Sequence, residues 1–444
     1  MHLLHTAPAR RIPMNTPASG TTRTPPTPLD VLILGGGSAG LWTLDTLRRA
    51  GFDCLLAERS ALGTGQTIGS QGIIHGGLKY TLKGALTPSA KAIRDMPERW
   101  RASAEGSAEP DLSAGDVVRA PHCHLWRTAS LKSRVGMVGA RAGLRVAPVR
   151  IDRADWPDAL SQLQGEVFRL DEQVWSPARF LAALARPHAD RILRVVEEDG
   201  VRVVAPPTDS EHAPQVEVRC PQGRQAVLAP RWIVVTAGVG AELLRTEIGL
   251  PKPRMQRRPV HMILVRGRSL PVLNGHCVDG RVTRVTITSD TDAQGRTVWQ
   301  VGGQVSEDGV NLAPEALLRL ALTEVRASLG GFDADDAEWS TYRLDKAEVS
   351  THGGLRPDDA YLAKDARVLT AWPTKLALVP RLADLVLAEV SAEARPAPGS
   401  GDSLDGSIHT EALHGWPGVD VALPPWEVDR SWTPSAELQA VGAS

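Results

Sequence analysis

The stretch Asp30-Val-Leu-Ile-Leu-Gly-Gly-Gly-Ser-Ala-Gly40 decides the fold class. Its first five residues form an apolar run without polar alternation, as expected of a strand buried on both faces of a parallel sheet. Leucines then recur at helical spacing up to Gly51, which suits the end of a helix. Phe52–Ala57 predicts a second strand, with Glu58 at its end. The stretch therefore opens a strand–helix–strand unit.

The glycines of this unit match the pattern G-x-G-x-x-G. The first glycine permits a tight turn, the second lets the backbone approach a pyrophosphate, and the third lets helix and strand pack closely. The helix N-terminus offers free N–H groups to phosphate, and a carboxylate 18 residues beyond the last glycine can bind an adenosine ribose. The expected dinucleotide contacts are Gly35, Gly37, Ser38, Ala39, Gly40 and Glu58. The acid disfavours NADP but does not separate NAD from FAD.

Composition excludes several classes of protein. The 444 residues predict two or three domains, and 50 basic against 51 acidic side chains give no electrostatic case for a nucleic-acid partner. No apolar run approaches the roughly 18 residues of a transmembrane segment. The four cysteines lie too far apart for a CxxC motif, and they fit a reducing compartment. We expect a cytoplasmic protein, with peripheral membrane association left open.

A second block, Gly65-Gln-Thr-Ile-Gly-Ser-Gln-Gly-Ile-Ile-His-Gly-Gly-Leu-Lys-Tyr80, carries a family resemblance. It resembles the FAD-dependent oxidoreductases of the D-amino-acid oxidase and glycine oxidase superfamily. Its second half is most similar to the glycerol-3-phosphate dehydrogenase branch, which has Arg in place of Lys79. Three later stretches resemble other motifs of the family, in the family's order: Thr236–Gly238, Gly353–Pro357 and Trp372–Lys375. The family's final glycine-rich turn is replaced here by Ala371-Trp372-Pro373.

The resemblance implies an α/β fold with a Rossmann-like FAD-binding domain of the glutathione-reductase type. An interleaved α+β substrate domain is expected on an antiparallel sheet, because Val260–Val265, Arg281–Thr288 and Thr297–Gln304 read as an antiparallel group. We expect a disordered tail at 1–29 (with Met14 as an alternative start), an FAD-binding domain at 30–97, 171–250 and 345–394, a substrate domain at 98–170 and 251–344, and an extension at 395–444.

FAD is the cofactor that the resemblance implies, held non-covalently. Further cofactor contacts are then expected at Arg59, Gln66, Thr67, Ser70, Gln71, Gly72, Ala237, Gly238, Thr374 and Lys375. The small and hydroxyl-bearing residues suit the pyrophosphate and ribityl chain. Thr374 and Lys375 at a helix start would stabilise the anionic reduced ring. The alternative is a solvated loop and an ordinary capped helix.

Four residues are candidates for the reaction itself: His75, Lys79, Tyr80 and Arg356. His75 suits an acid/base near the flavin, although a buried structural histidine or a covalent flavin link are alternatives. Lys79 and Tyr80 can present a cation and a phenol to an anion, and Arg356 suits bidentate binding of a carboxylate or phosphate. Their alternatives are a surface charge for Lys79 and a structural ion pair for Arg356.

No metal site is expected. His122-Cys123-His124 cannot all face one ion from a strand, where side chains alternate. The leading hypothesis is an FAD-dependent oxidoreductase that takes hydride from a CH–OH or CH–NH carbon of a small anionic substrate. The electron acceptor is oxygen, a quinone or another compound. The alternatives are a non-catalytic flavin-binding protein and an NAD-dependent dehydrogenase.

Overall fold

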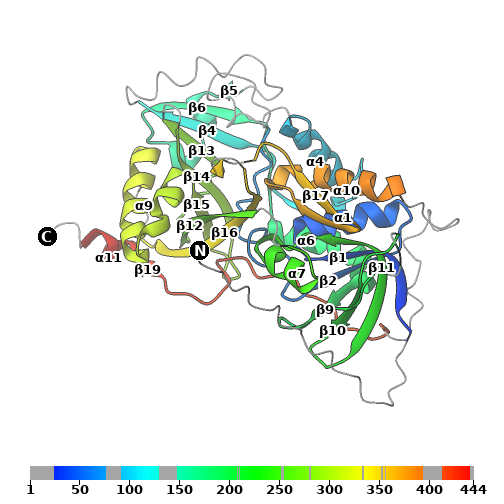
Figure 1. Ribbon diagram of the computed structural model, residues 1–444. Helices are drawn as coiled ribbons and strands as arrows, with labels where there is room; N and C mark the ends of the chain where they lie inside the picture. Colours follow the sequence, from blue (N-terminus) through cyan, green and yellow to red (C-terminus); the bar gives the residue numbers. More distant parts are fainter. Residues whose placement is uncertain are drawn as a thin grey trace, which may run out of the picture.

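The computed structural model describes most of the chain. The described residues are 25–76, 92–129, 148–207, 209, 211–251, 255–279, 282–332, 335–351, 354–355, 357–393 and 413–440. They form two lobes, each built on its own β-sheet (Figure 1). Within these ranges, no helix is both long and apolar enough to cross a membrane.

The first lobe contains an eight-stranded, mostly parallel sheet in the order β17-β18-β11-β1-β2-β8, with β9 and β10 attached to β11. Its strands are β1 (Thr27–Leu34), β2 (Cys54–Glu58), β8 (Ile192–Arg194), β9 (Val201–Ala205), β10 (Gln215–Arg219), β11 (Gln225–Val235), β17 (Tyr361–Asp365) and β18 (Val368–Trp372). Its helices are α1 (Ser38–Arg49), α4 (Met96–Ala104), α6 (Pro177–Ala185), α7 (Ala241–Glu247) and α10 (Val379–Glu393).

Strand β1 is buried on both faces, as its unbroken apolar run predicts. Val31 and Ile33 pack with α1, α6 and α10 in one core, whereas Leu32 and Leu34 pack with β9, β10 and α7 in another. Both neighbours of β1 run parallel to it, namely β2 and β11. Helix α1 ends where predicted, because Gly51 follows its cap with a left-handed φ of 88°.

The second lobe contains a nine-stranded sheet in the order β19-β16-β12-β15-β14-β13-β4-β6-β5. Its strands are β4 (Cys123–Thr128), β5 (Val149–Arg150), β6 (Gly165–Leu170), β12 (Met255–Gly267), β13 (Gly275–Asp279), β14 (Val282–Thr291), β15 (Thr297–Gly302), β16 (Glu338–Val349) and β19 (Thr433–Pro434). Its strands are antiparallel to their neighbours except β4 and β13. Helix α9 (Pro314–Leu329) covers one face and packs its apolar side on Ile263, Val285 and Trp299.

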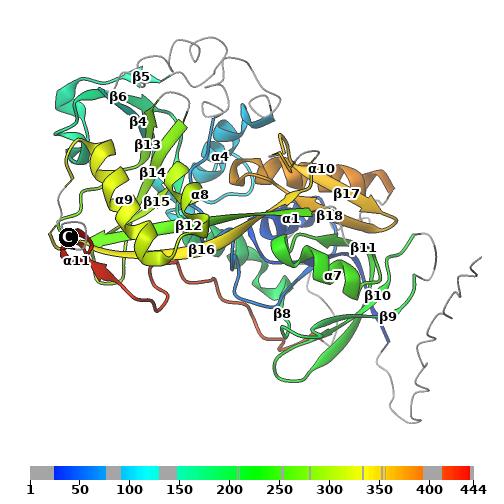
Figure 2. The same cartoon turned by 60° about the vertical axis from the view of Figure 1, so that its left-hand side comes forward.

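Two long strands join the lobes. Strands β12 and β16 pair over twelve residues, and they run from the second lobe into the core of the first (Figure 2). The boundary expected between residues 344 and 345 therefore falls inside β16. The sequence pattern could not reveal this, because strand β16 alternates its exposure without a break along its length.

Two other expected boundaries also differ from the structure. Strand β1 begins at Thr27, inside the expected disordered tail, because Thr27 pairs with Leu228. Residues just after 98 pack in the first lobe: the Trp100 ring lies 4.8 Å from Trp42 and 4.7 Å from Trp175.

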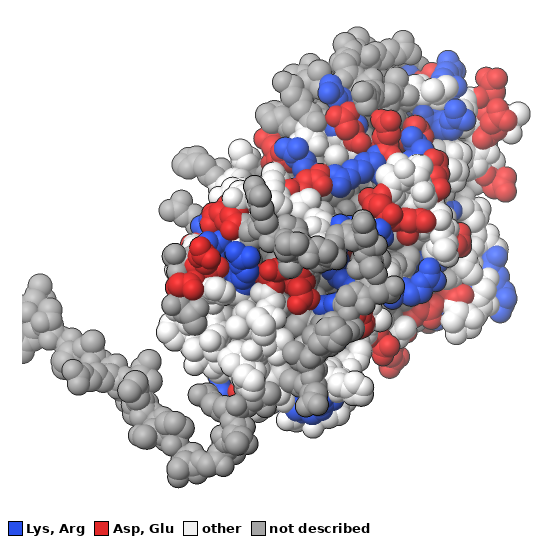
Figure 3. Space-filling model, turned by 90° about the vertical axis from the view of Figure 1, so that its right-hand side faces the viewer, with Lys and Arg blue, Asp and Glu red and all other residues white. Residues whose placement is uncertain are grey.

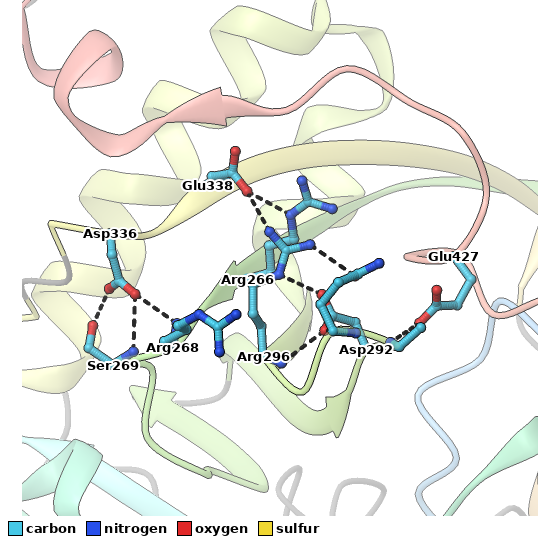
Figure 4. A network of polar contacts seen from close by, with 10 residues as sticks. Arg266, Arg268, Ser269, Asp292, Arg296, Asp336, Glu338 and Glu427 are labelled. Carbon is cyan, nitrogen blue, oxygen red and sulfur yellow. Dashed lines mark hydrogen bonds and ion pairs between the residues drawn. The ribbon is translucent and has the colours of Figure 1, made fainter.

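The segment 413–440 crosses both lobes. In the second lobe, Glu427 accepts a hydrogen bond from the Ala293 N–H, beside a network in which Arg266 and Arg296 both donate to Glu338 (Figure 4). In the first lobe, the Asp420 carbonyl accepts a bond from the Leu62 N–H. The expected C-terminal extension therefore forms structured contacts with both sheets.

The surface reflects the balanced composition. On the face shown in Figure 3, acidic and basic side chains intermingle, and neither sign gathers into a large patch. Many charged side chains of the described residues are paired, such as Lys364 with Glu389 and Arg381 with Asp359.

Candidate FAD site and active site

The glycine turn between β1 and α1 is shaped by close backbone contacts. Gly35 has a φ of 113°, and a Cβ there would lie 2.7 Å from the Cα of Ala237. A Cβ on Gly40 would lie 1.9 Å from the Gly35 carbonyl oxygen. Side chains at these two positions would push α1 away from the sheet. The turn therefore needs glycine at both places, as the pattern predicts.

The middle glycine leaves an open space at the helix N-terminus. Gly37 is the N-cap residue of α1, and a Cβ there would meet only the Thr67 Oγ1, at 3.3 Å. The Ser38 N–H donates to that same Thr67 Oγ1 at 3.2 Å. Thr67, one of the expected contacts in the second block, thus lies directly against the helix N-terminus. A phosphate at this place would meet N–H groups and the positive end of the helix dipole.

Glu58 lies at the end of β2 beside the turn. Its carboxylate accepts bonds from the Gly36 N–H at 2.5 Å and the Ser60 N–H at 2.7 Å. Burial raises the pKa of Glu58, and the backbone bonds oppose this rise. Each oxygen keeps a second lone pair for a ribose hydroxyl. Arg59 lies close by, with its guanidinium near Gly240.

The block Gly65–Gly72 is bonded to strands of the second sheet and, through Thr67, to the N-terminus of α1. Gln66 accepts the Ala347 N–H at 2.9 Å, and Gln71 donates at 2.9 Å to the carbonyls of both Thr286 and Gln300. A Cβ on Gly72 would lie 1.9 Å from the Trp175 carbonyl oxygen. These contacts fix a stretch whose sequence has no regular period. The irregular backbone of this block is therefore held in place beside the cavities.

Two adjoining cavities follow this path. The first, of about 360 Å³, is lined by the turn, Glu58, Arg59, Ala237 and Gly238. The second, of about 240 Å³, is lined by residues of the glycine turn and of the second block, including His75, and by Thr374 and Lys375. The residues that line both cavities are Gly37, Gln66, Thr67, Thr236, Gly238 and Leu344. The structure thus brings the expected cofactor residues of four distant segments to one elongated space.

Polar atoms in this space are left unpaired in a way that fits a bound polar group. The Ser70 Oγ and the Trp372 Nε1 are both buried, and neither finds a hydrogen-bond partner among the described residues. Both residues line the second cavity. Unpaired buried donors are costly, so a ligand with acceptor atoms suits the space. Trp372 replaces the family's glycine here, and it was not among the expected contacts.

The segment before α10 differs from its expected form. Thr374 has a left-handed φ of 59°, and its hydroxyl donates to the Asp359 carbonyl at 3.1 Å. The Lys375 ammonium donates to the Asp358 carbonyl at 2.9 Å. A short 3-10 turn (Leu376–Leu378) follows, and α10 begins at Val379 just before Pro380. Proline at the start of a helix explains the late start.

His75 is the last but one described residue of the second block and lines the second cavity. Its Nδ1 lies 3.2 Å from the Oε2 of Glu172, while its Nε2 makes no hydrogen bond to a described residue. The Glu172 Oε1 accepts the Gly76 N–H at 2.7 Å. His276 approaches the same oxygen, with its Nε2 3.9 Å from the Oε2 and its ring centre 5.5 Å from that of His75. Glu172 and His276 were missed by sequence analysis, because neither belongs to a recognisable motif.

Two further groups of residues singled out in the sequence remain to be described. Lys79, Tyr80 and Arg356 lie outside the described residues. In the His122–His124 stretch, Cys123 is fully buried, while the two histidine rings lie 5.1 Å apart. Burial lowers the pKa of His124 to about 4.

Comparison with known proteins assigns the family. The model of the FAD-dependent oxidoreductase (DAO) family matches residues 30–368. The chain belongs to this family. It is therefore an FAD-dependent oxidoreductase, and the NAD-dependent and non-catalytic interpretations are set aside. The resemblance predicted from the glycine turn and the Gly65–Tyr80 block is confirmed.

Relatives agree with this assignment. A probable FAD-dependent oxidoreductase of Pseudomonas aeruginosa, PA4991, is 38% identical over 403 residues, which cover 90% of this chain and 97% of that protein. Its crystal structure matches with a TM-score of 0.73 over 91% of this chain and 99% of that chain, at 32% identity. Glycine oxidase from Geobacillus kaustophilus shares the fold at 15% identity, with a TM-score of 0.56 over 83% of this chain and 96% of that chain. The FAD-bound L-alpha-glycerophosphate oxidase from Mycoplasma pneumoniae shares it at 12% identity, with a TM-score of 0.55 over 82% and 95%.

Proposed function

We propose that this flavoenzyme oxidises a CH–OH carbon of a small organic anion, with His75 as the base that takes the hydroxyl proton. The bound flavin supplies the hydride acceptor at N5. The observation that carries the proposal is that His75 lines the same cavity as Gly37, Ser38 and Ala39 of the glycine turn. A CH–NH substrate is the competing possibility, and it needs no such base when its amine is already neutral.

In this proposal, each group of site residues holds a different part of FAD. The turn Gly35–Gly40 with Thr67 would hold the pyrophosphate, and Glu58 with Arg59 the adenosine. Gln66, Ser70, Gln71 and Gly72 would hold the ribityl chain and one edge of the ring, with Ala237 and Gly238 on the opposite side. Apart from Gly40, these residues line the two adjoining cavities. The ring would then lie between His75 and the Thr374–Lys375 segment.

Charge favours an anionic substrate. Lys346, Lys375, Glu307 and Glu348 line the second cavity. Glu348 is neutralised by Arg258, whose Nη2 lies 3.3 Å from its Oε2. With Arg258, three cationic side chains lie in or beside the cavity, against two carboxylates. The family resemblance implies that Lys79 and Arg356 would add two more cations, and Tyr80 a hydroxyl donor. A carboxylate or phosphate suits such a pocket.

His75 can act as a base because only one of its ring nitrogens is occupied by a described partner. Its Nδ1 faces Glu172, and the side chain is 23% exposed. The opposite nitrogen, Nε2, is then available to a hydroxyl group in the cavity. General base catalysis by a positioned imidazole contributes about 10²–10⁴ in rate.

The variant His75→Gln tests this role. We expect it to retain FAD and to bind substrate, while the rate of anaerobic flavin reduction falls at least about a hundredfold. Rapid mixing with glycerol 3-phosphate and with 2-hydroxyglutarate, followed by flavin absorbance, measures this rate. Reduction as fast as in the unmodified enzyme would remove His75 from the reaction. Loss of flavin from the variant would instead indicate a covalent or structural role.

A further inference from the structure

A buried carboxylate beside the active-site cavity has two neighbouring imidazoles near the same oxygen. Glu172 has a side chain only 2% exposed, and it follows the end of β6. His75 approaches its Oε2 from the second block and His276 from β13, with the two rings 5.5 Å apart. The second lobe thus contributes two residues that contact the histidine of the first.

The negative charge of Glu172 is stabilised by neighbouring groups. Burial alone would raise the pKa of this carboxyl group, but His75, His276 and the Gly76 N–H hold it below its ordinary value. The Oε1 is occupied by the Gly76 N–H, which leaves the Oε2 for the imidazoles. His276 is itself fixed, because its Nδ1 lies 2.9 Å from the Thr286 hydroxyl. The carboxylate is therefore held in a fixed position, with its Oε2 as the oxygen that contacts the imidazoles.

We propose that Glu172 is a positioning residue that selects the tautomer of His75, with His276 beside the same carboxylate oxygen. The Oε2 accepts the proton on Nδ1 of His75, so that Nε2 carries the lone pair that faces the cavity. This inference rests on the proposed role of His75 as base. A carboxylate in this position also stabilises the imidazolium that forms when Nε2 takes a proton from the substrate hydroxyl.

The arrangement favours this role over a structural ion pair on the protein surface. Surface pairs are exposed and contribute little, whereas Glu172 is buried and bonded to the ring that lines the cavity. A divalent metal would be an alternative occupant, because the ligand atoms of His75, Glu172 and His276 all lie within 4.8 Å of one another. The 3.2 Å separation of Nδ1 and Oε2 is already a hydrogen-bond distance, which needs only a proton.

The variant Glu172→Gln tests the inference in a way that needs no substrate. Its amide oxygen would keep the bond from the Gly76 N–H, so that its NH₂ group would face Nδ1 of His75. A donor there requires a lone pair on Nδ1 and moves the ring proton to Nε2. We expect ¹⁵N chemical shifts of His75 in the FAD-bound protein to show a proton on Nδ1 originally and on Nε2 in the variant. His75→Gln assigns the signals.

Kinetics supply the second readout. We expect Glu172→Gln to slow anaerobic flavin reduction by glycerol 3-phosphate or 2-hydroxyglutarate at least about a hundredfold, with the substrate dissociation constant unchanged. Glu172→Asp should recover part of this loss, and His276→Gln should cost less, because His276 acts through the carboxylate. Glu166→Gln is the matched control. It makes the same change on β6, in a carboxylate that is paired with Arg127 of β4. The flavin of this variant should be reduced at the normal rate.

Distinct results separate this inference from the proposed function. One outcome is that neither glycerol 3-phosphate nor 2-hydroxyglutarate reduces the flavin, while the tautomer of His75 still reverses in Glu172→Gln. In that case Glu172 selects the tautomer as inferred, and the proposed reaction is wrong. A proton on Nε2 of His75 in the unmodified protein, or no reversal in the variant, would overturn the inference. Stoichiometric metal in the purified protein, lost in His276→Gln, would overturn it in favour of a metal site.

Discussion

At the scale of single residues, the glycines of the turn have separable tasks. Gly35 and Gly40 are required by backbone packing, whereas Gly37 faces open space at the N-terminus of α1. The first two therefore belong to the fold, and the third belongs to the site. This difference allows cofactor binding to be disrupted without disrupting the sheet.

We expect Gly37→Val to lose FAD while it keeps its secondary structure. The new side chain would lie near Thr67, in the space that the pyrophosphate needs. The flavin content of purified protein and its circular dichroism measure the two effects. Gly418→Val is the control, because a Cβ at Gly418 meets nothing within 4 Å. A variant of Gly37 that retains flavin would place the pyrophosphate elsewhere.

Lys375 is expected to tune the flavin. Its ammonium is held by the Asp358 carbonyl, and the residue lines the second cavity. Removing a cation near a ring that becomes anionic makes reduction harder, so Lys375→Met should lower the midpoint potential by about 20 mV, or about 1 kcal/mol. Redox titration of the bound flavin measures this shift. Lys364→Met, which removes a surface lysine paired with Glu389, should leave the potential unchanged; equal potentials in all three proteins would remove Lys375 from the flavin's surroundings.

At the scale of elements, the contact between α1 and β1 depends on Gly40. A Cβ there would overlap the Gly35 carbonyl oxygen, which is backbone and cannot rotate away. We expect Gly40→Ala to lower the free energy of unfolding by about 3 kcal/mol. Denaturant unfolding measures the loss, and Gly418→Ala should show almost none. Unchanged stability would mean that α1 is free to shift on the sheet.

The elements themselves could largely be predicted from the sequence. Leu32 and Leu34 alternate with Val31 and Ile33 in one unbroken apolar run, and such a run indicates a central parallel strand. Helix α9 follows from its apolar spacing and the proline at its first position. The boundaries were less accurate, because pairing partners decide them. Thr27 extends β1 only because Leu228 lies opposite.

The candidate site could be predicted only in part. Its cofactor half is contiguous in sequence, and glycine spacing has a direct steric meaning. The catalytic half is assembled from residues far apart: 97 positions separate His75 from Glu172 in the chain. A lone glutamate after a strand carries no local signal, and His276 resembles any buried strand residue. Only the pairing of β13 with β4 and β14 brings that histidine to the carboxylate.

At the scale of the whole molecule, the segment 413–440 holds the lobes together. It bonds to Leu62 and Arg194 in the first lobe, and to Ser340 and Trp339 in the second. Arg266 of β12 lies 3.7 Å from the ring centre of Trp432. Leu62 directly precedes the Gly65–Gly72 block. The same segment therefore supports both the fold and the cofactor site.

We expect a chain that ends at Glu393 to be less stable by at least about 3 kcal/mol, because Leu413, Trp426 and Leu438 are buried. It should also bind FAD more weakly, since Leu62 loses its bonds to Asp420 and Ala422. Thermal unfolding and FAD titration measure the two effects. A chain that lacks only residues 441–444 is the control. Full stability and full flavin content in the shorter chain would contradict this account.

The most direct test of the proposed function is anaerobic bleaching of the bound flavin by a matched panel of compounds. The panel pairs 2-hydroxyglutarate with glutamate, and glycerol 3-phosphate with glycerol. We predict that at least one hydroxylated anion bleaches the flavin, while glutamate and neutral glycerol do not. Bleaching by glutamate alone would show that the enzyme oxidises a CH–NH carbon, and bleaching by glycerol as fast as by its phosphate would contradict the cationic pocket.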